Sequence, residues 1–360
     1  MRKLLKIPAV LRDMKRLARE AMSPNVLTAF IDFDYQHYAL GDMLTKAVYC
    51  ACRAIDSGCR AIDLFLIIDP SRPSAPAQGF VTPENYVTHL YGLAPAFLCT
   101  PMLRALHILR DSGLAASYYR VAAVQAGHPH WPSYRAQARR EITYPLGHHE
   151  INDFHARRGY VPKLQAPQGY EAWARAFAAK LMPGKFVVCV NPRQSRLTAS
   201  PAVTYRDANL EDWYAFIDRA GVELPRVVFL QVGGYAEWDR TILDRDNVIV
   251  PRAMGLGLAH ELALMSRAQM FIGTSSGFAA MATFSDLPYL ICDVEHFFAP
   301  FAGIEVGADA YPFAGEDQFL LWEKEEPDLL FAHLERVFER WPRRGRSRPG
   351  RARARAAAVH

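Results

Sequence analysis

The 360-residue sequence contains no apolar run long enough to cross a bilayer, which needs about 20 consecutive apolar residues. Its first 22 residues are basic, but they contain a proline and alternate charged with apolar side chains. They also lack the apolar core and the small-residue cleavage site of a secretory signal. We therefore expect a cytoplasmic protein.

Paired cysteines are missing as well. None of the six cysteines forms a C-x-x-C pair with the spacing of metal ligands, and most of them lie in apolar segments. Such cysteines are typical of buried thiols in a reducing compartment.

Positive charge is scarce outside the two ends of the chain. Residues 1–20 hold 7 Lys and Arg against 2 acidic residues, and residues 341–360 hold 7 Arg and no acidic residue. The two ends together have a net charge of +12. Since the whole chain has a net charge of +5, the residues between the ends have a net charge of −7. A nucleic-acid-binding protein carries its positive charge on the folded body, so we expect no nucleic-acid partner.

The basic ends are predicted to be a helix over residues 1–20 and a disordered Arg-rich tail over residues 341–360. A solvating extension is the favoured interpretation of the tail. The alternative is a peripheral contact of both basic ends with the inner membrane face, which contributes about 1 kcal/mol per basic residue near an anionic surface.

What the sequence does contain is two successive series of alternating strands and helices, the pattern of parallel α/β sheets. Its length suits two domains. We expect an N-terminal domain over residues 21–165, a C-terminal domain over 170–325 and a closing helix over 326–340. The linker is placed near Pro162–Gly169, at the end of an aperiodic stretch from His128 to Tyr170.

The first series predicts strands at Val26–Phe33, Ala61–Asp69 and Ala116–Val124, with helices after Gly41, at Tyr86–Leu93 and at Pro101–Ser112. The second series predicts helices at Tyr170–Leu181, Leu210–Gly221, Ala259–Ala268 and from Ser276. Its strands are predicted at Lys185–Asn191, Arg226–Gly234, Asn247–Val250, Met270–Gly273 and Pro288–Asp293.

The sharpest motif is FIGTSSGFAAM, in which Thr274, Ser275, Ser276 and Gly277 lie between a predicted strand and helix. Hydroxyls, free backbone amides and the positive end of a helix dipole at such a turn suit a phosphate group. The alternative is that Ser and Thr only cap the helix. Taken by itself, the segment leaves both interpretations open, although a cap needs only one of the three hydroxyls.

Arginines and glycines follow two other strands of the second series. Arg193 lies just after one strand, and Arg206 lies just before the next helix. Guanidinium groups at the carboxyl edge of an open α/β sheet match a diphosphate bidentately, whereas surface solvation is the alternative. Gly233 and Gly234 end the next strand, where they allow a ligand to approach the backbone or serve as a simple turn.

In the first series, Gly41 and Asp42 open the helix that follows the first strand. This position puts the Asp42 carboxylate at the carboxyl edge of the sheet, where it can remove a proton from an attacking hydroxyl. A helix N-cap is the alternative, because aspartate favours that position intrinsically.

Together these motifs resemble family 9 glycosyltransferases, the heptosyltransferase group, and related bacterial glycosyltransferases. The resemblance rests on Gly41-Asp42, Arg206, Gly233-Gly234 and Thr274–Gly277. The related set also matches Arg193, Tyr205 and the N-D-F…GY-P-K pattern of Asn152–Lys163. Arg206 stands where heptosyltransferases usually carry lysine, and the turn lacks their histidine, so the resemblance does not indicate a heptose donor.

The resemblance implies the GT-B fold, in which two Rossmann-like α/β domains face a central cleft. It implies inverting sugar transfer from a nucleotide-sugar substrate, without metal or cofactor, to a hydroxyl of a glycan, a lipid-linked sugar or a protein. Asp42 would be the catalytic base. The donor would be bound by Arg193, Arg206, Gly233, Gly234, Thr274, Ser275, Ser276 and Gly277. A nucleotide-sugar epimerase and a non-catalytic binding protein are the alternatives.

Two further features resemble metal-binding patterns, but we expect neither to be a metal site. Asp32 and Asp34 form a D-x-D pattern, but they lie on the acceptor side and are read as ordinary strand-end residues. Five histidines match no standard zinc spacing, so we expect loop or acceptor-pocket residues there: His128, His130, His148, His149 and His155.

Overall fold

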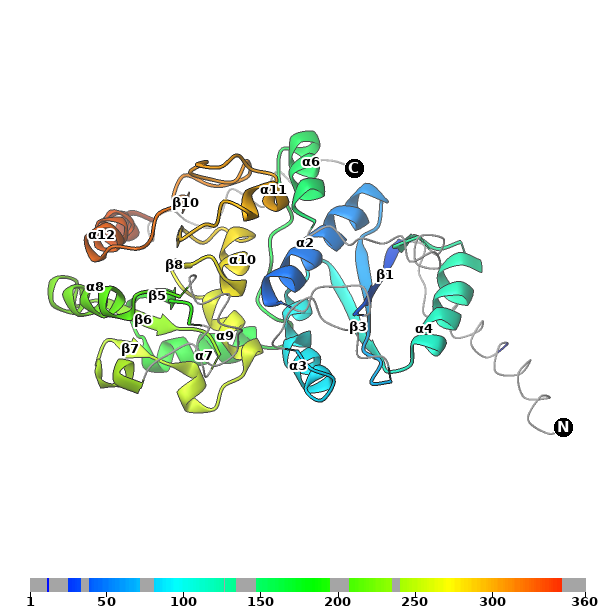
Figure 1. The fold of residues 1–360 in the computed structure, drawn as a ribbon, viewed down its shortest axis with the longest axis horizontal. Helices are drawn as coiled ribbons and strands as arrows, with labels where there is room; N and C mark the ends of the chain where they lie inside the picture. Colours follow the sequence, from blue (N-terminus) through cyan, green and yellow to red (C-terminus); the bar gives the residue numbers. More distant parts are fainter. Residues whose placement is uncertain are drawn as a thin grey trace.

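The computed structural model describes residues 25–33, 39–71, 81–125, 127–133, 147–194, 207–234 and 240–344, together with Arg12. It contains two parallel β-sheets flanked by helices (Figure 1). Within the described residues, no helix combines the length and the apolar character needed to span a bilayer. The predicted helix over residues 1–20 lies outside this range, apart from Arg12, as does the tail beyond Arg344.

Sheet A has the strand order β3-β2-β1-β4, and every pair in it is parallel. The central strand β1 (Val26–Asp32) is buried along its whole length, as expected of an apolar strand covered on both faces. Helix α2 (Leu40–Asp56) connects β1 to β2 (Ala61–Ile67), as predicted. The remaining strands are β3 (Leu103–Leu109) and β4 (His130–Trp131).

The prediction for residues 101–124 was wrong. The segment predicted as a helix is strand β3, and the segment predicted as a strand is helix α4 (Ser112–Tyr119) followed by a π-helical turn, Arg120–Gln125. As an edge strand, β3 leaves several side chains exposed and so lacks a continuous apolar run. Asp111 is the N-cap of α4, and its carboxylate accepts a hydrogen bond from the Leu114 amide at 2.6 Å.

Sheet B has the order β10-β9-β8-β5-β6-β7, again parallel throughout. The five strands predicted in this half are present: β5 (Phe186–Asn191), β6 (Val227–Gln231), β7 (Val248–Ile249), β8 (Met270–Thr274) and β9 (Tyr289–Cys292). Strand β10 (Gln318–Leu320) was not predicted. The predicted helices correspond to α7 (Glu171–Leu181), α8 (Leu210–Glu223), α9 (Leu258–Met265) and α10 (Gly277–Thr283).

Helices cover both faces of sheet B. Helices α8 and α12 (Pro327–Arg344) share one buried cluster with one face of the sheet. Helix α12 occupies the predicted closing helix and continues to Arg344, past the expected boundary at residue 340. A second buried cluster on the opposite face includes residues of α9 and α10 and extends to α2 and sheet A, so the two halves share one continuous core.

Short helices complete the described chain. Helix α3 (Tyr86–Leu93) was predicted, whereas α11 (Phe298–Ala302) was not. The remaining short elements are 3-10 helices at Ala94–Cys99, Arg240–Asp244 and Pro251–Met254.

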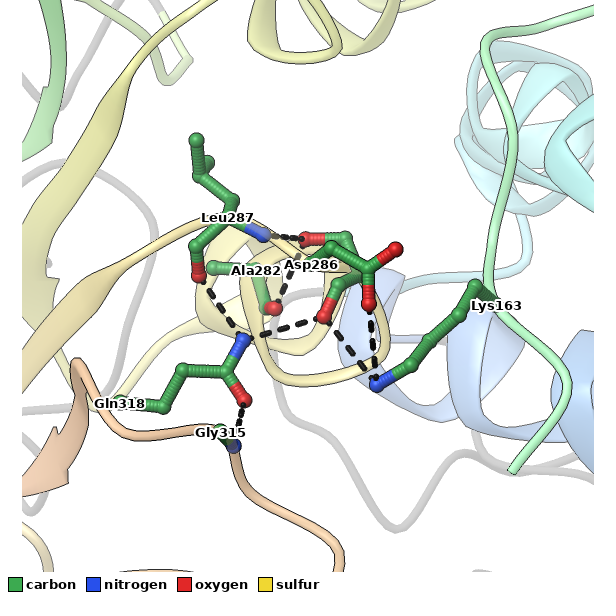
Figure 2. Close-up of polar contacts among 7 residues, drawn as sticks. Lys163, Ala282, Asp286, Leu287, Gly315 and Gln318 are labelled. Atoms are coloured by element: carbon green, nitrogen blue, oxygen red, sulfur yellow. Dashed lines mark hydrogen bonds and ion pairs between the residues drawn. The ribbon is translucent and has the colours of Figure 1, made fainter. Parts of the chain in front are cut away.

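The stretch predicted to lack periodicity contains helix α6 (His148–Arg158). The Asn152 amide donates to the carbonyls of Ala302 and Gly303, so α6 is attached to the C-terminal half of the chain. Further along, the Lys163 ammonium donates to the Ser285 carbonyl at 3.3 Å and lies 3.7 Å from the Asp286 carboxylate (Figure 2). The N-D-F…GY-P-K pattern therefore joins the two halves of the molecule.

Candidate functional site

The strand order of sheet B defines where a ligand is expected. From β5 the chain proceeds to β6 and β7 on one side, and then returns to place β8 on the other side of β5. Open α/β sheets bind ligands at such a reversal, beyond the carboxyl ends of the strands. Here β5 and β8 end side by side, with Asn191 paired to Gly273.

Two predicted donor-site residues meet at this reversal. The Arg193 backbone amide donates a hydrogen bond to the Thr274 hydroxyl at 3.1 Å. Thr274 is buried, whereas Arg193 is partly exposed. The residues that directly follow β5 and the end of β8 are therefore joined at the carboxyl edge.

The hydroxyls of the turn have local structural roles. Besides accepting from Arg193, Thr274 lies 3.5 Å from the Asn191 carbonyl. The Ser276 side chain is the N-cap of α10 and accepts from the Ala279 amide at 3.4 Å. The capping interpretation is thus correct for Ser276. The Ser275 amide donates to the Cys292 carbonyl at 2.9 Å, so a phosphate at this turn would be bound through the amides of the partly exposed Ser276 and Gly277 more than through three hydroxyls.

Gly233 lies at the same edge, after β6. Its φ of 140° is in the region that favours glycine, and its amide donates to the Glu261 carboxylate at 3.1 Å. The other carboxylate oxygen of Glu261 accepts from Arg252 Nε at 2.7 Å. Glu261 is fully buried, so this pair fixes the Gly233–Gly234 backbone. Sequence reasoning missed it, although a glutamate inside the apolar helix AHELALM was a usable signal.

Asp42 lies in the first turn of α2. The helix has Ala39 as its N-cap and begins at Leu40, so the interpretation of Asp42 as the N-cap was wrong. A carboxylate in the first turn still interacts favourably with the helix dipole. Asp42 is partly exposed, at the carboxyl edge of sheet A, as the sequence predicted.

Two glycines bring Asp42 close to the Thr274–Gly277 turn, the proposed donor turn. A Cβ atom on Gly277 would lie 2.7 Å from Leu40 Cβ and 3.1 Å from the Gly41 backbone nitrogen. Helices α2 and α10 therefore lie side by side (Figure 1). They meet at their N-terminal ends, at Gly41 and Gly277. This contact places the first turn of α2, with Asp42, beside the Thr274–Gly277 turn.

Most of the predicted residues thus lie at the carboxyl edges of the two sheets, whereas Arg206 lies outside the described residues. So does Asp34, the second member of the D-x-D pattern. The loops 34–38, 195–206 and 235–239, which follow β1, β5 and β6, are not described, so the space that they line is not described either.

Two described cavities lie elsewhere. Their volumes are about 470 and 330 Å³, and both include Asp286 and Pro288, which precede β9. They therefore open at the amino-terminal edge of sheet B, opposite the reversal between β5 and β8. Geometry and topology favour the carboxyl edge as the functional one.

The histidines are not grouped in an irregular loop. His148, His149 and His155 belong to α6, and His148 is buried among the rings of Phe284, Phe298 and Tyr311. Burial lowers the pKa of His148 to about 3, so its ring is neutral at physiological pH. Across the described ranges, no three His, Cys, Asp or Glu side chains are grouped as metal ligands.

A substitution at Gly277 tests the contact between the two helices. We expect Gly277→Val to destabilise the protein by about 1–3 kcal/mol, because the added methyl groups would overlap Leu40 and Gly41. Urea unfolding measures this change. Gly257→Val is the matched control, since a Cβ atom there has no neighbour within 4 Å. Equal stability of the two variants would show that α2 and α10 are not in contact in solution.

Lys46 lies one turn after Asp42 on α2 and is 3 % exposed. Burial lowers the pKa of its ammonium group to about 8, although Cys50, Asp42 and Glu150 oppose this shift. Between pH 8 and 10.5 the unfolded lysine binds more protons than the folded one, so the free energy of unfolding should rise with pH in this window. The unfavourable contribution of Lys46 is then complete below about pH 8 and absent above pH 10.5.

We therefore expect Lys46→Met to be more stable than the wild type at pH 7 by about 3 kcal/mol, and by much less at pH 10. Urea unfolding of both proteins at the two pH values measures the difference. Other alkaline titrations affect both proteins, so the comparison isolates Lys46. A stability difference that does not change with pH would refute the lowered pKa.

No family model matches this sequence, and no curated protein sequence matches it. Thirteen solved chains match its structure. One is a glycosyl transferase family 9 protein from Veillonella parvula DSM 2008, with a TM-score of 0.51 and 12% identity over 88% of this chain and 97% of that one. Another is the ADP-heptose lps heptosyltransferase II of E. coli, with a TM-score of 0.50 and 12% identity over 88% and 99%. The chain therefore has the two-domain GT-B glycosyltransferase fold that its sequence resemblance predicted.

Proposed function

We propose that this protein transfers a sugar from a nucleoside-diphosphate sugar to a hydroxyl acceptor. The observation that carries the proposal is the contact between Gly41 and Gly277. It puts the first turn of α2, which contains Asp42, beside the Thr274–Gly277 turn that follows β8. A carboxylate on one side of a junction and a phosphate-binding edge on the other is the arrangement that direct glycosyl transfer requires.

On the donor side, the diphosphate would lie at the carboxyl ends of β5 and β8, which are joined by the hydrogen bond between Arg193 and Thr274. Arg193 and Arg206 would bind the phosphate oxygens, and the backbone amides at the start of α10 would add further donors. These groups stabilise the negative charge that develops on the departing nucleoside diphosphate. The Gly233–Gly234 backbone, fixed by Glu261, would contact the nucleoside.

On the acceptor side, Asp42 would remove the proton from the attacking hydroxyl. The hydroxyl oxygen forms a bond to the anomeric carbon as the bond from that carbon to the diphosphate breaks, and the configuration is inverted. The reaction as proposed needs neither a metal nor a cofactor. A glycan, a lipid-linked sugar or a protein side chain would supply the hydroxyl.

A thermal-shift screen across GDP, UDP, ADP and CMP tests the donor side. We expect one nucleoside diphosphate to stabilise the protein clearly more than the others, by about 2.7 kcal/mol at 100 times its dissociation constant. The corresponding nucleoside, which lacks phosphate, is the control. If no nucleotide stabilises the protein at millimolar concentration, the donor site is misassigned.

A further inference from the structure

Lys46 has a second property besides its burial, which is its position relative to Asp42. Residues four apart on a helix lie on the same face, so Lys46 and Asp42 are neighbours on α2. Lysine is almost never fully buried unless its charge is compensated. A 3 % exposed lysine beside a candidate base therefore calls for a functional explanation.

Helix α6 packs against the α2 turn that contains Lys46. A Cβ atom on Gly147 would lie 3.2 Å from Tyr49 Cβ and 3.7 Å from Thr45 Cγ2, so α6 begins directly against this turn. Its first turn contributes two titratable groups that interact electrostatically with Lys46, namely Glu150 and His148.

Among the described residues, the titratable groups that interact electrostatically with Lys46 include Cys50, Asp42, Glu150 and His148. His148 is neutral, and burial raises the pKa of the Cys50 thiol to about 12, so that this thiol stays protonated. Asp42 on α2 and Glu150 on α6 are the acidic groups whose interaction favours the charged form of Lys46. The charged form of Lys46 is thus favoured by a carboxylate at the proposed reaction site and by a second carboxylate on α6.

We propose that Lys46 is a positioning residue for sugar transfer, whose buried ammonium keeps Asp42 ionised and holds its carboxylate at the start of α2. This inference rests on the proposed role of Asp42 as the base. An adjacent positive charge lowers the proton affinity of a carboxylate, so Asp42 remains a competent base at lower pH. Glu150 supports this role by favouring the charged form of Lys46.

A titration of Lys46 tests the coupling without any need for catalysis. Its side-chain NMR signals are followed with pH in the wild type, in Asp42→Asn and in the control Glu211→Gln, an exposed position on α8. We expect Asp42→Asn to lower the titration midpoint of Lys46 by about one pH unit, because a nearby negative charge is lost. The control should leave the midpoint unchanged. An identical midpoint in all three proteins would overturn the inference.

The pH profile of transfer tests the consequence for the reaction. In Lys46→Met the acid limb of kcat/KM should move to higher pH by about one unit, and Lys46→Arg should restore it. A merely structural role would lower the rate at every pH without moving this limb. An unmoved limb in Lys46→Met contradicts the inference. Absence of any transfer by the wild type would instead contradict the proposed function, and the NMR titration would still decide whether Lys46 and Asp42 are coupled.

Discussion

Asp42→Asn should lower turnover by about two to four orders of magnitude, the usual effect of losing a positioned general base. The amide has nearly the size of the carboxylate but cannot accept the proton of the acceptor hydroxyl. Because Ala39 rather than Asp42 is the N-cap of α2, the substitution removes a first-turn charge and a charge that favours the ammonium form of Lys46, but no cap. Stability should therefore fall by about 1–2.5 kcal/mol.

Three measurements on this variant separate catalysis from folding: initial rates of transfer, urea unfolding and nucleotide affinity. Nucleotide affinity should hardly change, since the donor is bound from sheet B. Wild-type turnover in Asp42→Asn would remove Asp42 from the mechanism, and Asp34 would become the next carboxylate to test.

Arg193→Ala should weaken the binding of the preferred nucleoside diphosphate by roughly one to two orders of magnitude. A charge-assisted hydrogen bond to phosphate contributes about 1.5–3 kcal/mol when it is well desolvated. The contact with Thr274 uses the backbone amide of Arg193, so the substitution keeps that hydrogen bond and changes only the side chain. Isothermal titration calorimetry measures the affinity directly.

Arg206→Ala should have a similar effect on this affinity. Arg175→Ala, which removes an exposed arginine on α7, is the matched control and should leave the affinity unchanged. If both Arg193→Ala and Arg206→Ala bind the nucleotide as tightly as the wild type, the arginines belong to the solvated surface and the donor assignment fails.

Much of the fold could be predicted because buried parallel strands are continuous apolar runs. Strands β1, β5 and β8 are buried along their whole length, and each was predicted within a few residues of its bounds. The edge strand β3 was missed because its side chains face both solvent and core. Helix α6 was missed because its polar sequence has little apolar periodicity, and its N-cap is Gly147, which has no side chain to cap the helix.

The grouping of the candidate residues could be predicted because their motifs follow strand ends, which parallel topology gathers at the carboxyl edge of each sheet. The role of each side chain could not be predicted from the sequence. The sequence indicated three hydroxyls at the turn, but it gave no sign that Thr274 accepts from Arg193. The closeness of Gly277 to Leu40, the burial of Lys46 and the hydrogen bond from Gly233 to Glu261 likewise depend on contacts between segments far apart in the chain.

The central claim is that the protein moves a sugar onto a hydroxyl. Its most direct test is to incubate the protein with the sugar form of the nucleotide that stabilises it most, with and without a panel of glycan, lipid-linked and protein acceptors. Nucleotide release and the products are then followed by mass spectrometry and NMR. We expect release that depends on an acceptor, together with a glycoside of inverted anomeric configuration. An isomerised nucleotide sugar formed without any acceptor, or binding that never leads to nucleotide release, would contradict the account.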